Sequence, residues 1–421
     1  MMKDTVRIAV IGGGAAGMMA AAEAAQAGAS VTLYEKNKRL GKKLAITGKG
    51  RCNVTNDCTP DAFIRSIPTN PRFLFGAIHA FSPEDTKAML SDLGVALKTE
   101  RGSRVFPVSD DAHEIVSAME RRMREAGVHI RYETVEALLF SEETDSGARH
   151  VTGVRTPRGS FAYDRVIVCT GGLSYPGTGS TGDGYRFARE AGLSVTPLYP
   201  SLVPIVCKES FCREMMGLSL KNTALRITEG EGTKAVYEDF GEMLFTHFGV
   251  SGPMILSASA HLKKERIADY VLHLDLKPAL DEKMLDERIL RDFGAAINKN
   301  FSNVIGGLVP AKMANVVMRL SGISPTEKCN TVTKEQRRAL RSTLKDLRIH
   351  TVDFRPIDEA IVTSGGVSVK ELNPKTMEAK RVRGLYFAGE VIDVDGYTGG
   401  FNLQIAFSTA AAAARAAVLP E

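Results

Sequence analysis

The stretch from Val6 to Glu35 reads VRIAVIGGGAAGMMAAAEAAQAGASVTLYE and decides the fold. Residues 6–11 form an apolar run of strand length, glycines follow, and an alanine-rich helical stretch then leads to a second apolar run. This order predicts a strand over 6–11, a helix over 18–27 and a strand over 30–34. A buried strand that turns into a helix and then into a parallel strand is the first βαβ unit of an α/β domain.

The glycines of this turn predict a dinucleotide site. Gly12, Gly14 and Gly17 match the pattern GxGxxG, and the match lies between a strand and a helix, as the chemistry requires. Gly12 allows the tight turn, Gly14 lets backbone N–H groups approach a pyrophosphate, and Gly17 allows the helix to pack closely on the strand. Glu35 ends the second strand, where a carboxylate accepts hydrogen bonds from ribose hydroxyls. The predicted cofactor contacts of this segment are Gly12, Gly14, Ala15, Ala16, Gly17, Glu35 and Lys36.

This fingerprint does not separate FAD from NAD, and the C-terminal end of the chain favours FAD. Residues 384–390 read GLYFAGE and predict a strand that ends in a glycine and a carboxylate, which is placed to bind a ribityl hydroxyl. Residues 396–402 read GYTGGFN and lead into a final helix from about Asn402. Backbone N–H groups at such a helix start would stabilise negative charge on the N1 and O2 edge of a reduced flavin. The predicted contacts here are Gly389, Glu390, Gly400, Phe401, Asn402 and Leu403.

Five motifs in a fixed order resemble one family of flavoproteins. They are residues 12–17, 48–56 (GKGRCNVTN), 175–184 (YPGTGSTGDG), 245–253 (FTHFGVSGP) and 389–404. This succession resembles the aminoacetone-oxidase and BaiN-like group of bacterial FAD-dependent oxidoreductases, and the resemblance covers nearly the whole chain. It implies a Rossmann-type FAD-binding domain interrupted by a β-barrel-like domain that itself carries a helical insertion.

The predicted helices and strands along the sequence agree with this architecture. The expected FAD-binding domain takes residues 1–195 and 355–421, the barrel-like domain takes 196–278 and 348–354, and the helical insertion takes 279–347. Helices are predicted over about 83–93 and 111–126, and strands over 128–132, 135–140, 151–156 and 165–170. Residues 36–56 show no clear periodicity and predict a long functional loop.

The resemblance also implies further cofactor contacts. The loop from Thr47 to Asn53 is expected to line the flavin, with Arg51 offsetting negative charge there. Lys42 and Lys43 would lie near the ribose or the phosphates, unless they are ordinary solvated lysines. The backbone of Val135 would read the adenine. The implied set is Lys42, Lys43, Thr47, Gly48, Arg51, Cys52, Asn53, Val135, Thr170, Gly171 and Gly172.

Two features that suggest other chemistry are weaker. Cys52 lies in the flavin loop, but the chain has no CxxC partner for it, so a packing role is favoured over a redox role. Gly177, Gly179 and Gly182 form a second GxGxxG match, yet no acid ends a strand about 20 residues later, as an NAD(P) domain would require. We therefore expect electrons to come from the substrate itself or from NAD(P)H that docks transiently.

The candidate catalytic residues are His247 and Tyr175, because hydride transfer at the flavin needs a matched proton movement. Asp393, Asp395 and Tyr397 adjoin the flavin helix and are expected to play supporting roles. The favoured reaction is NAD(P)H-driven reduction of an activated double bond, such as that of a 3-oxo bile-acid or steroid-like enone. An oxidase of a small amine such as aminoacetone is the alternative, and a flavin-containing RNA-binding protein is a third interpretation.

Composition limits the remaining possibilities. The chain has 421 residues, 44% hydrophobic and 24% charged, which is globular composition. Its net charge of +5 is too small to predict a nucleic-acid partner, although residues 261–350 carry 17 Lys and Arg against 11 Asp and Glu. No leader segment, membrane span or metal-ligating cysteine pattern is apparent. We expect a cytoplasmic enzyme with a small-molecule substrate and no metal, and the oligomeric state stays open.

Overall fold

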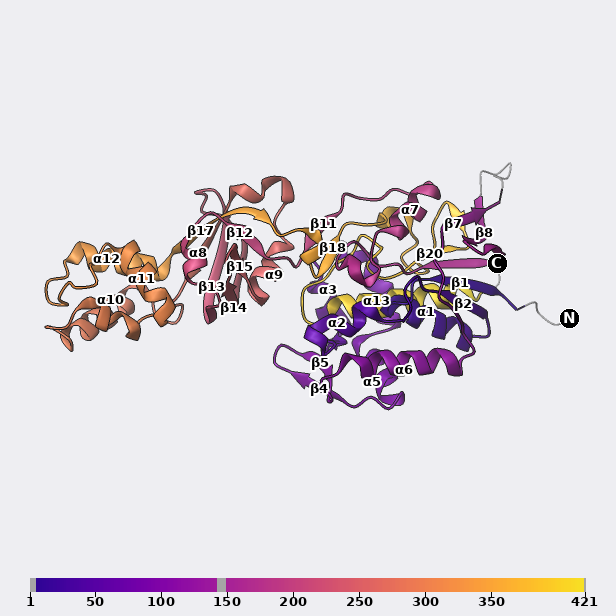
Figure 1. Ribbon diagram of the computed structural model, residues 1–421, viewed down its shortest axis with the longest axis horizontal. Helices are drawn as coiled ribbons and strands as arrows, with labels where there is room; N and C mark the ends of the chain where they lie inside the picture. Colours follow the sequence, from indigo (N-terminus) through magenta and orange to yellow (C-terminus); the bar gives the residue numbers. More distant parts are fainter. Residues whose placement is uncertain (1–4, 142–148, 420–421) are drawn as a thin grey trace. The chain divides into compact units, whose positions relative to one another are not determined.

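The computed structural model describes residues 5–141 and 149–419, which form two compact units (Figure 1). The first unit takes the chain up to Ser201 and again from Ile357, and the second takes Leu202–Pro356. The sequence-based boundaries were 195 and 355, and residues 279–347 belong to the second unit in the structure. Within each unit, strand pairing brings together segments that are far apart in the sequence.

The centre of the first unit is a parallel five-stranded sheet with strand order β20-β10-β1-β2-β6. Apart from the edge strand β6, its strands are mostly buried, which explains the continuous apolar runs of the sequence. The predicted strand over 30–34 is confirmed residue for residue. The strands are β1 Arg7–Ile11, β2 Ser30–Tyr34, β6 His129–Arg131, β10 Arg165–Val168 and β20 Leu385–Phe387.

Two alanine-rich helices lie against each other in this unit, α1 (Ala15–Gln26) and α13 (Phe401–Ala417), as Figure 1 shows. Their alanine side chains are buried and small, so the two backbones approach closely. Helix α1 begins at Ala15 rather than at the predicted residue 18, because the turn glycines lead directly into it. The other helices here are α3 Pro60–Arg65, α4 Phe75–Ala80, α5 Pro83–Asp92, α6 Ala112–Glu125 and α7 Asp183–Glu190.

Residues 36–56 are not the irregular loop that the sequence predicts. They contain α2 (Lys42–Gly50) and the short strand β3 (Thr55–Asn56). Helix α2 is kinked, since Thr47, Gly48 and Lys49 have non-helical backbone angles. The glycines at 41, 48 and 50 all adopt positive φ, which hides the helical pattern in the sequence.

Three smaller sheets complete the first unit. Strand β8 pairs with β7, β9 and β19, β5 pairs with β3 and β4, and β11 pairs with β18. The bounds are β4 Leu97–Glu100, β5 Arg104–Pro107, β7 Ala137–Phe140, β8 Arg149–Thr156, β9 Gly159–Ala162, β11 Tyr199–Ser201, β18 Val362–Ser364 and β19 Val382–Arg383.

The second unit contains a closed barrel with strand order β12-β15-β14-β13-β16-β17. The predicted strand pieces at 225–228 and 235–237 are parts of two eleven-residue strands, because alternating polar side chains on the outer face conceal their length in the sequence. The bounds are β12 Ile205–Cys207, β13 Ser219–Glu229, β14 Ala235–Phe245, β15 Gly249–Ser251, β16 Tyr270–Asp275 and β17 Leu347–Phe354.

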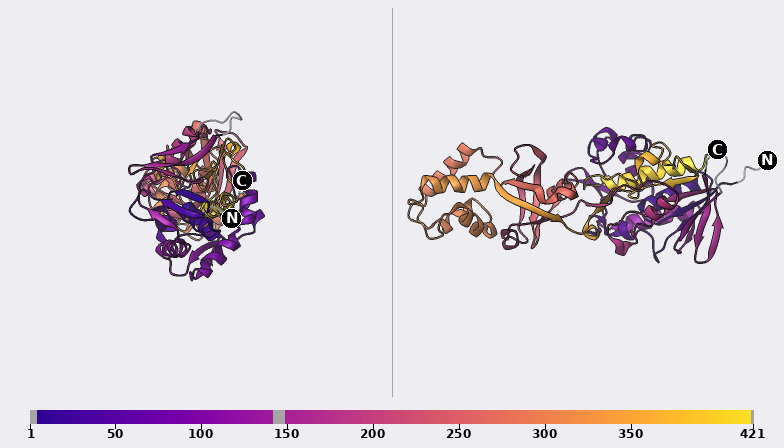
Figure 2. Two further views of the ribbon diagram at one scale, coloured as in Figure 1. Left: turned by 90° about the vertical axis from the view of Figure 1, so that its right-hand side faces the viewer. Right: turned by 90° about the horizontal axis from the view of Figure 1, so that it is seen from above.

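The sequence predicts helices between β16 and β17, and the structure has α10, α11 and α12 there. They pack around buried residues such as Leu285, Ile289, Leu340 and Leu344. Helix α12 leads almost directly into β17, which the right-hand view of Figure 2 shows in orange. The helices are α8 Phe211–Glu214, α9 Pro253–Ser259, α10 Glu282–Gly294, α11 Ala311–Ser321 and α12 Lys334–Lys345. Among the helices of the described residues, none has the length and apolarity that a bilayer crossing requires.

Candidate functional site

The carboxyl ends of β1, β10 and β20 bring three predicted motifs to one edge of the parallel sheet. A Cβ atom at Gly12 would lie 2.9 Å from the carbonyl carbon of Cys169, and one at Gly389 would lie 2.9 Å from the Cβ atom of Ala16. The turn after β1 therefore lies against the backbone that follows β10, and the turn after β20 lies against the first turn of α1. Ligands of α/β sheets bind at this edge, where neighbouring strands diverge.

The start of α1 is built to receive an anion. Gly12 has a φ of 103°, which favours glycine, and a Cβ atom at Gly17 would overlap the Gly12 carbonyl oxygen. Helix α1 has no side-chain cap and no acid in its first turn, so its first N–H groups are free for a ligand. The space beside Gly14 is open, since a Cβ atom there would meet nothing within 4 Å. This combination fits a pyrophosphate.

Glu35 lies beside this turn and is 7% exposed. Its carboxylate accepts hydrogen bonds from the Gly13 N–H at 2.7 Å and from the backbone and side-chain N–H groups of Asn37 at 2.7 and 2.6 Å. Asn37 is a residue that the sequence analysis did not single out. These bonds fix the Glu35 carboxylate at the end of β2, where a ribose hydroxyl would be bound.

The start of α13 is held by a buried network that the sequence analysis missed. The backbone of Gly400, with a φ of 98°, lies against Thr55, leaving no room for a Cβ atom. Gln404 is fully buried, and its amide oxygen accepts hydrogen bonds from the hydroxyls of Thr55 and Thr86 at 2.6 and 2.7 Å. Its amide nitrogen donates to the Phe81 carbonyl oxygen at 3.1 Å. The first turn of α13 has neither a side-chain cap nor an acid, so its N–H groups can face a flavin edge.

Other predicted residues at this end of α13 have structural partners. The Asn402 side chain exchanges hydrogen bonds with the backbone of Gly396 at 2.9 and 2.8 Å and so fixes the approaching loop. Phe401 is 8% exposed and packs against Phe63 at a ring distance of 5.0 Å. Leu403 packs partly buried against the core.

Glu390 lies in a cluster that joins four segments of the chain. One carboxylate oxygen accepts a hydrogen bond from the Lys43 ammonium group at 2.6 Å. The other accepts from the Ser174 hydroxyl at 3.0 Å and from the Thr363 N–H at 2.9 Å. Gly172 lies against Thr363 and Glu390, and a Cβ atom there would lie 2.8 Å from the carboxylate. The structure thus brings Lys43, Gly172 and Glu390 together, with Ser174 and Thr363 as members that sequence reasoning missed.

Two buried polar atoms in the predicted cofactor loops lack a hydrogen-bond partner among the described residues. They are the Oδ1 atom of Asn53 and the Oγ1 atom of Thr170. Buried polar groups in proteins are nearly always paired, so each of these oxygens fits a site for a polar ligand. Asn53 lies in the loop after α2. Thr170 lies in the loop after β10, next to Gly171, which has a φ of 71°.

Cys52 is fully buried in the first of these loops. Burial raises the pKa of its thiol to about 12, so the thiol stays protonated near neutral pH. The favoured packing role is consistent with this, since an active thiol needs access and a lowered pKa. The hydroxyl of the neighbouring Thr47 donates to the Leu44 carbonyl oxygen at 2.7 Å and closes the end of the helical part of α2. Gly48 has a φ of 57°, and a Cβ atom at this position would lie 3.1 Å from the backbone nitrogen of Asn53.

The remaining basic residues of the predicted set are engaged by the protein. The Arg51 guanidinium group pairs with Glu100 and Asp110, so its charge is already compensated and is not free to balance a flavin. Lys42 donates to the Gly177 carbonyl oxygen at 2.8 Å, and Lys36 pairs with Asp183 at 2.6 Å. These contacts tie α2 and the end of β2 to the segment around residues 177–183.

Val135, the predicted adenine contact, lies just before β7 rather than within it. The pairing of β7 with β8 begins at Ala137, so the backbone of Val135 lies outside this ladder. Its side chain is 4% exposed and belongs to the core.

The two candidate proton donors lie in different units. Tyr175 is in the first unit, next to Ser174 of the Glu390 cluster, and its φ of 53° is unusual for a tyrosine. His247 is exposed on the turn between β14 and β15 of the second unit, with its ring 4.9 Å from that of Phe248. Of the two, Tyr175 shares a unit with the predicted cofactor residues.

Two carboxyl groups follow β20: Asp395 is buried and Asp393 is partly buried. Asp395 is 1% exposed and accepts hydrogen bonds from the hydroxyls of Ser201 at 2.9 Å and Ser364 at 3.1 Å. Burial raises the pKa of Asp395 and also that of Asp393. Asp395 thereby links β11 to β18, the strands at which the chain leaves and re-enters the first unit.

Comparison with known proteins agrees with this site. The model of the family described as HI0933-like protein Rossmann domain matches residues 6–416. The chain belongs to this family. It is 32% identical over 408 residues to the ribosomal RNA dihydrouridine synthase of Escherichia coli, covering 96% of both chains. It is 30% identical over 416 residues to the 3-dehydro-bile acid delta(4,6)-reductase of Clostridium scindens, covering 98% of both chains.

The fold is also that of a solved ketosteroid dehydrogenase. The 3-ketosteroid-delta4-(5alpha)-dehydrogenase of Rhodococcus jostii superposes with a TM-score of 0.50 at 16% identity, covering 100% of this chain and 98% of that chain. With the family match, this confirms the Rossmann-type fold and the resemblance predicted from the five motifs. This HI0933-like protein is an FAD-dependent oxidoreductase, and the open start of α1, the Glu35 carboxylate and the unpaired atoms of Asn53 and Thr170 fit FAD.

Proposed function

We propose that the enzyme reduces a carbon–carbon double bond conjugated to a carbonyl group, with NAD(P)H as the source of electrons. The observation that carries this proposal is the shared chemistry of the two relatives matched over nearly the whole chain. A delta(4,6)-reductase of a 3-oxo bile acid and a synthase of dihydrouridine both add hydrogen to such a bond. In each, hydride addition is favoured because the carbonyl group accepts the charge that develops.

The residues of the first unit have defined roles in this proposal. Bound FAD supplies hydride transfer at its N5 atom. The N–H groups at the start of α1 would hold the pyrophosphate, and Glu35 would orient the adenosine ribose. The positive end of α13, at Gly400 and Phe401, would stabilise negative charge on the flavin ring. Glu390, fixed by Lys43 and Ser174, would hold a ribityl hydroxyl.

A proton must follow the hydride to complete the reduction. We propose Tyr175 as its donor, because it directly follows Ser174 of the Glu390 cluster and, being 38% exposed, is accessible to a substrate. His247 remains the second candidate. Replacing Tyr175 with Phe is expected to slow substrate reduction while leaving flavin reduction by NAD(P)H unchanged, which separates the proton step from the hydride steps.

The substrate is proposed to be either a steroid-like 3-oxo enone or a uridine in RNA. The E. coli relative favours uridine, whereas the C. scindens relative favours the enone, and both identities are similar. The sequence favours a small molecule, since the net charge is only +5.

Anaerobic flavin absorbance tests the reaction. We expect NADH or NADPH to bleach the 450 nm band of the FAD-loaded protein, and a conjugated enone or a uridine-containing ribosomal RNA fragment to restore it without oxygen. Bleaching by a small amine, with recovery only in air, would contradict the proposal and support an oxidase. Product analysis by mass spectrometry, as a gain of two hydrogen atoms, identifies which substrate is used.

A further inference from the structure

The second unit has a pocket that is lined only by residues of that unit. Its volume is about 180 Å³, and it lies where β13, the end of β16 and the start of α11 meet. Leu220, Leu276 and Val309 contribute apolar wall, and Lys221, Thr223 and Lys277 contribute polar groups. The pocket is thus an apolar hollow with cationic and hydroxyl groups.

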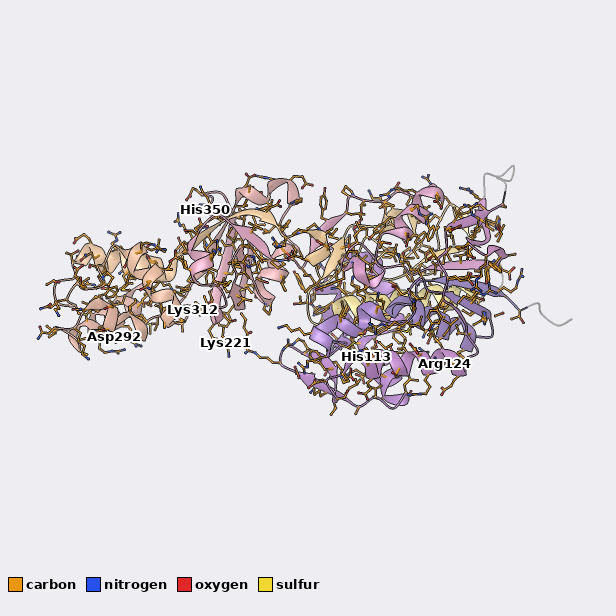
Figure 3. All side chains as sticks on the ribbon, in the orientation of Figure 1. His113, Arg124, Lys221, Asp292, Lys312 and His350 are labelled. Atoms are coloured by element: carbon orange, nitrogen blue, oxygen red, sulfur yellow. The ribbon has the colours of Figure 1, made fainter. Side chains whose placement is uncertain are left out.

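A β-bulge shapes one wall of this pocket. Leu220 pairs with Met243 and Thr223 with Gly241, so two residues of β13, Lys221 and Asn222, oppose one residue of β14. Such a bulge turns side chains away from their regular direction, and bulges occur frequently beside binding sites. Figure 3 shows Lys221 and Lys312 on the same side of this unit, where the barrel gives way to the helices.

The charge in the pocket is uncompensated. Within the described residues, neither Lys221 nor Lys277 forms an ion pair, and Asp275, at the end of β16, pairs with Lys345 at 2.5 Å. Burial, with the nearby Arg288 charge, lowers the pKa of Lys277. An anion in the pocket would stabilise the charged form of this lysine.

Two further groups point to an oxyanion. Helix α11 begins at the pocket wall without a side-chain cap and without an acid in its first turn, so its positive end is not neutralised. Thr223 is 2% exposed and lines the pocket, so a ligand there can reach its side chain.

We infer that this pocket binds a phosphate ester. A phosphate offers several oxygens to the ammonium groups, the hydroxyl and the helix N–H groups, and the apolar wall contacts the attached organic part. The volume is below the roughly 300–1,000 Å³ of complete small-molecule sites, so the pocket receives one phosphate with its adjoining group. The source is a free nucleotide or the backbone of an RNA, and this inference is independent of the reaction at the flavin.

Isothermal titration calorimetry on the full-length FAD-loaded protein tests the inference. The probes are inorganic phosphate, uridine 5′-monophosphate and a short single-stranded oligouridylate. Lys277→Met and Thr223→Val change the pocket, and Lys234→Met removes the same charge from the exposed turn between β13 and β14, at the other end of that hairpin. Melting temperatures establish that each variant is folded.

We expect saturable binding that weakens about tenfold in Lys277→Met and several-fold in Thr223→Val, with less than about twofold change in Lys234→Met. Equal affinity for the mononucleotide and the RNA identifies a nucleotide pocket, whereas tighter RNA binding with the same variant pattern identifies a backbone contact. Absence of saturable binding for all three probes, or equal losses in Lys277→Met and Lys234→Met, overturns the inference.

Discussion

At the scale of single residues, the site depends on backbone approaches that only glycine allows. Gly17 and Gly14 illustrate two different reasons. The Cβ position at Gly17 overlaps the Gly12 carbonyl oxygen, so the protein itself excludes a side chain. The Cβ position at Gly14 meets nothing within 4 Å, and its φ of −82° suits any residue. Only a ligand would exclude a side chain at Gly14.

This contrast leads to a paired prediction. Gly14→Ala is expected to leave the melting temperature of the FAD-free protein within a few degrees of wild type but to weaken FAD binding at least about tenfold, because the methyl group enters the pyrophosphate space. Gly17→Ala is expected to lower the stability of the FAD-free protein as well. Thermal melts with and without FAD, and flavin content after purification, measure both effects. A Gly14→Ala protein that binds FAD normally would contradict the assignment.

At the scale of elements, the sequence predicted those with strong local signals. Strand β2 and helix α5, with its Ser82 capping box, are recovered almost residue for residue. Helix α2 was missed because its glycines break the periodicity, and β13 and β14 were shortened by alternating polar residues. The dinucleotide fingerprint was readable because one turn carries it. The Gln404 network was not, since it joins α13 to residues more than 300 positions away.

The Gln404 network is predicted to hold α13 in place. Gln404→Leu would leave the buried hydroxyls of Thr55 and Thr86 without their acceptor, with an expected loss of about 3 kcal/mol in the free energy of unfolding. Urea denaturation of the FAD-free protein measures this loss. The triple variant with Thr55→Val and Thr86→Val should recover part of it, because the unpaired hydroxyls are then gone. No recovery in the triple variant would show that the loss has another origin.

The link between β11 and β18 predicts a pH dependence. An aspartate in the unfolded chain titrates near ~3.9, whereas burial raises the pKa of folded Asp395. Between these two pKa values the folded protein binds more protons than the unfolded chain, so the Asp395 contribution to stability is full below ~3.9 and is lost as the pH rises through the folded pKa. The free energy of unfolding of wild type relative to Asp395→Asn should therefore fall across this window. A difference between the two proteins that does not change with pH would contradict it.

At the scale of the whole molecule, the two compact units have separate ligands in the proposals above. The cofactor residues lie in the unit formed by the two ends of the chain, and the phosphate pocket lies entirely within residues 202–356. A ligand stabilises the folded state of the part that binds it, by an amount that grows with its concentration above the dissociation constant. Ligand effects on unfolding therefore report which unit holds which site.

Hydrogen exchange followed by mass spectrometry resolves this unit by unit. Adding FAD to the cofactor-free protein is expected to slow exchange most in peptides from β1, α1, the start of α13 and the loop after α2, since these segments carry the proposed contacts. Uridine 5′-monophosphate is expected to slow exchange in peptides around residues 220–223, 276–277 and 308–313. The opposite result would reverse the assignment: FAD would slow exchange around residues 220–223, 276–277 and 308–313, and the nucleotide would slow it in β1, α1 and α13. Each ligand would then bind in the other unit.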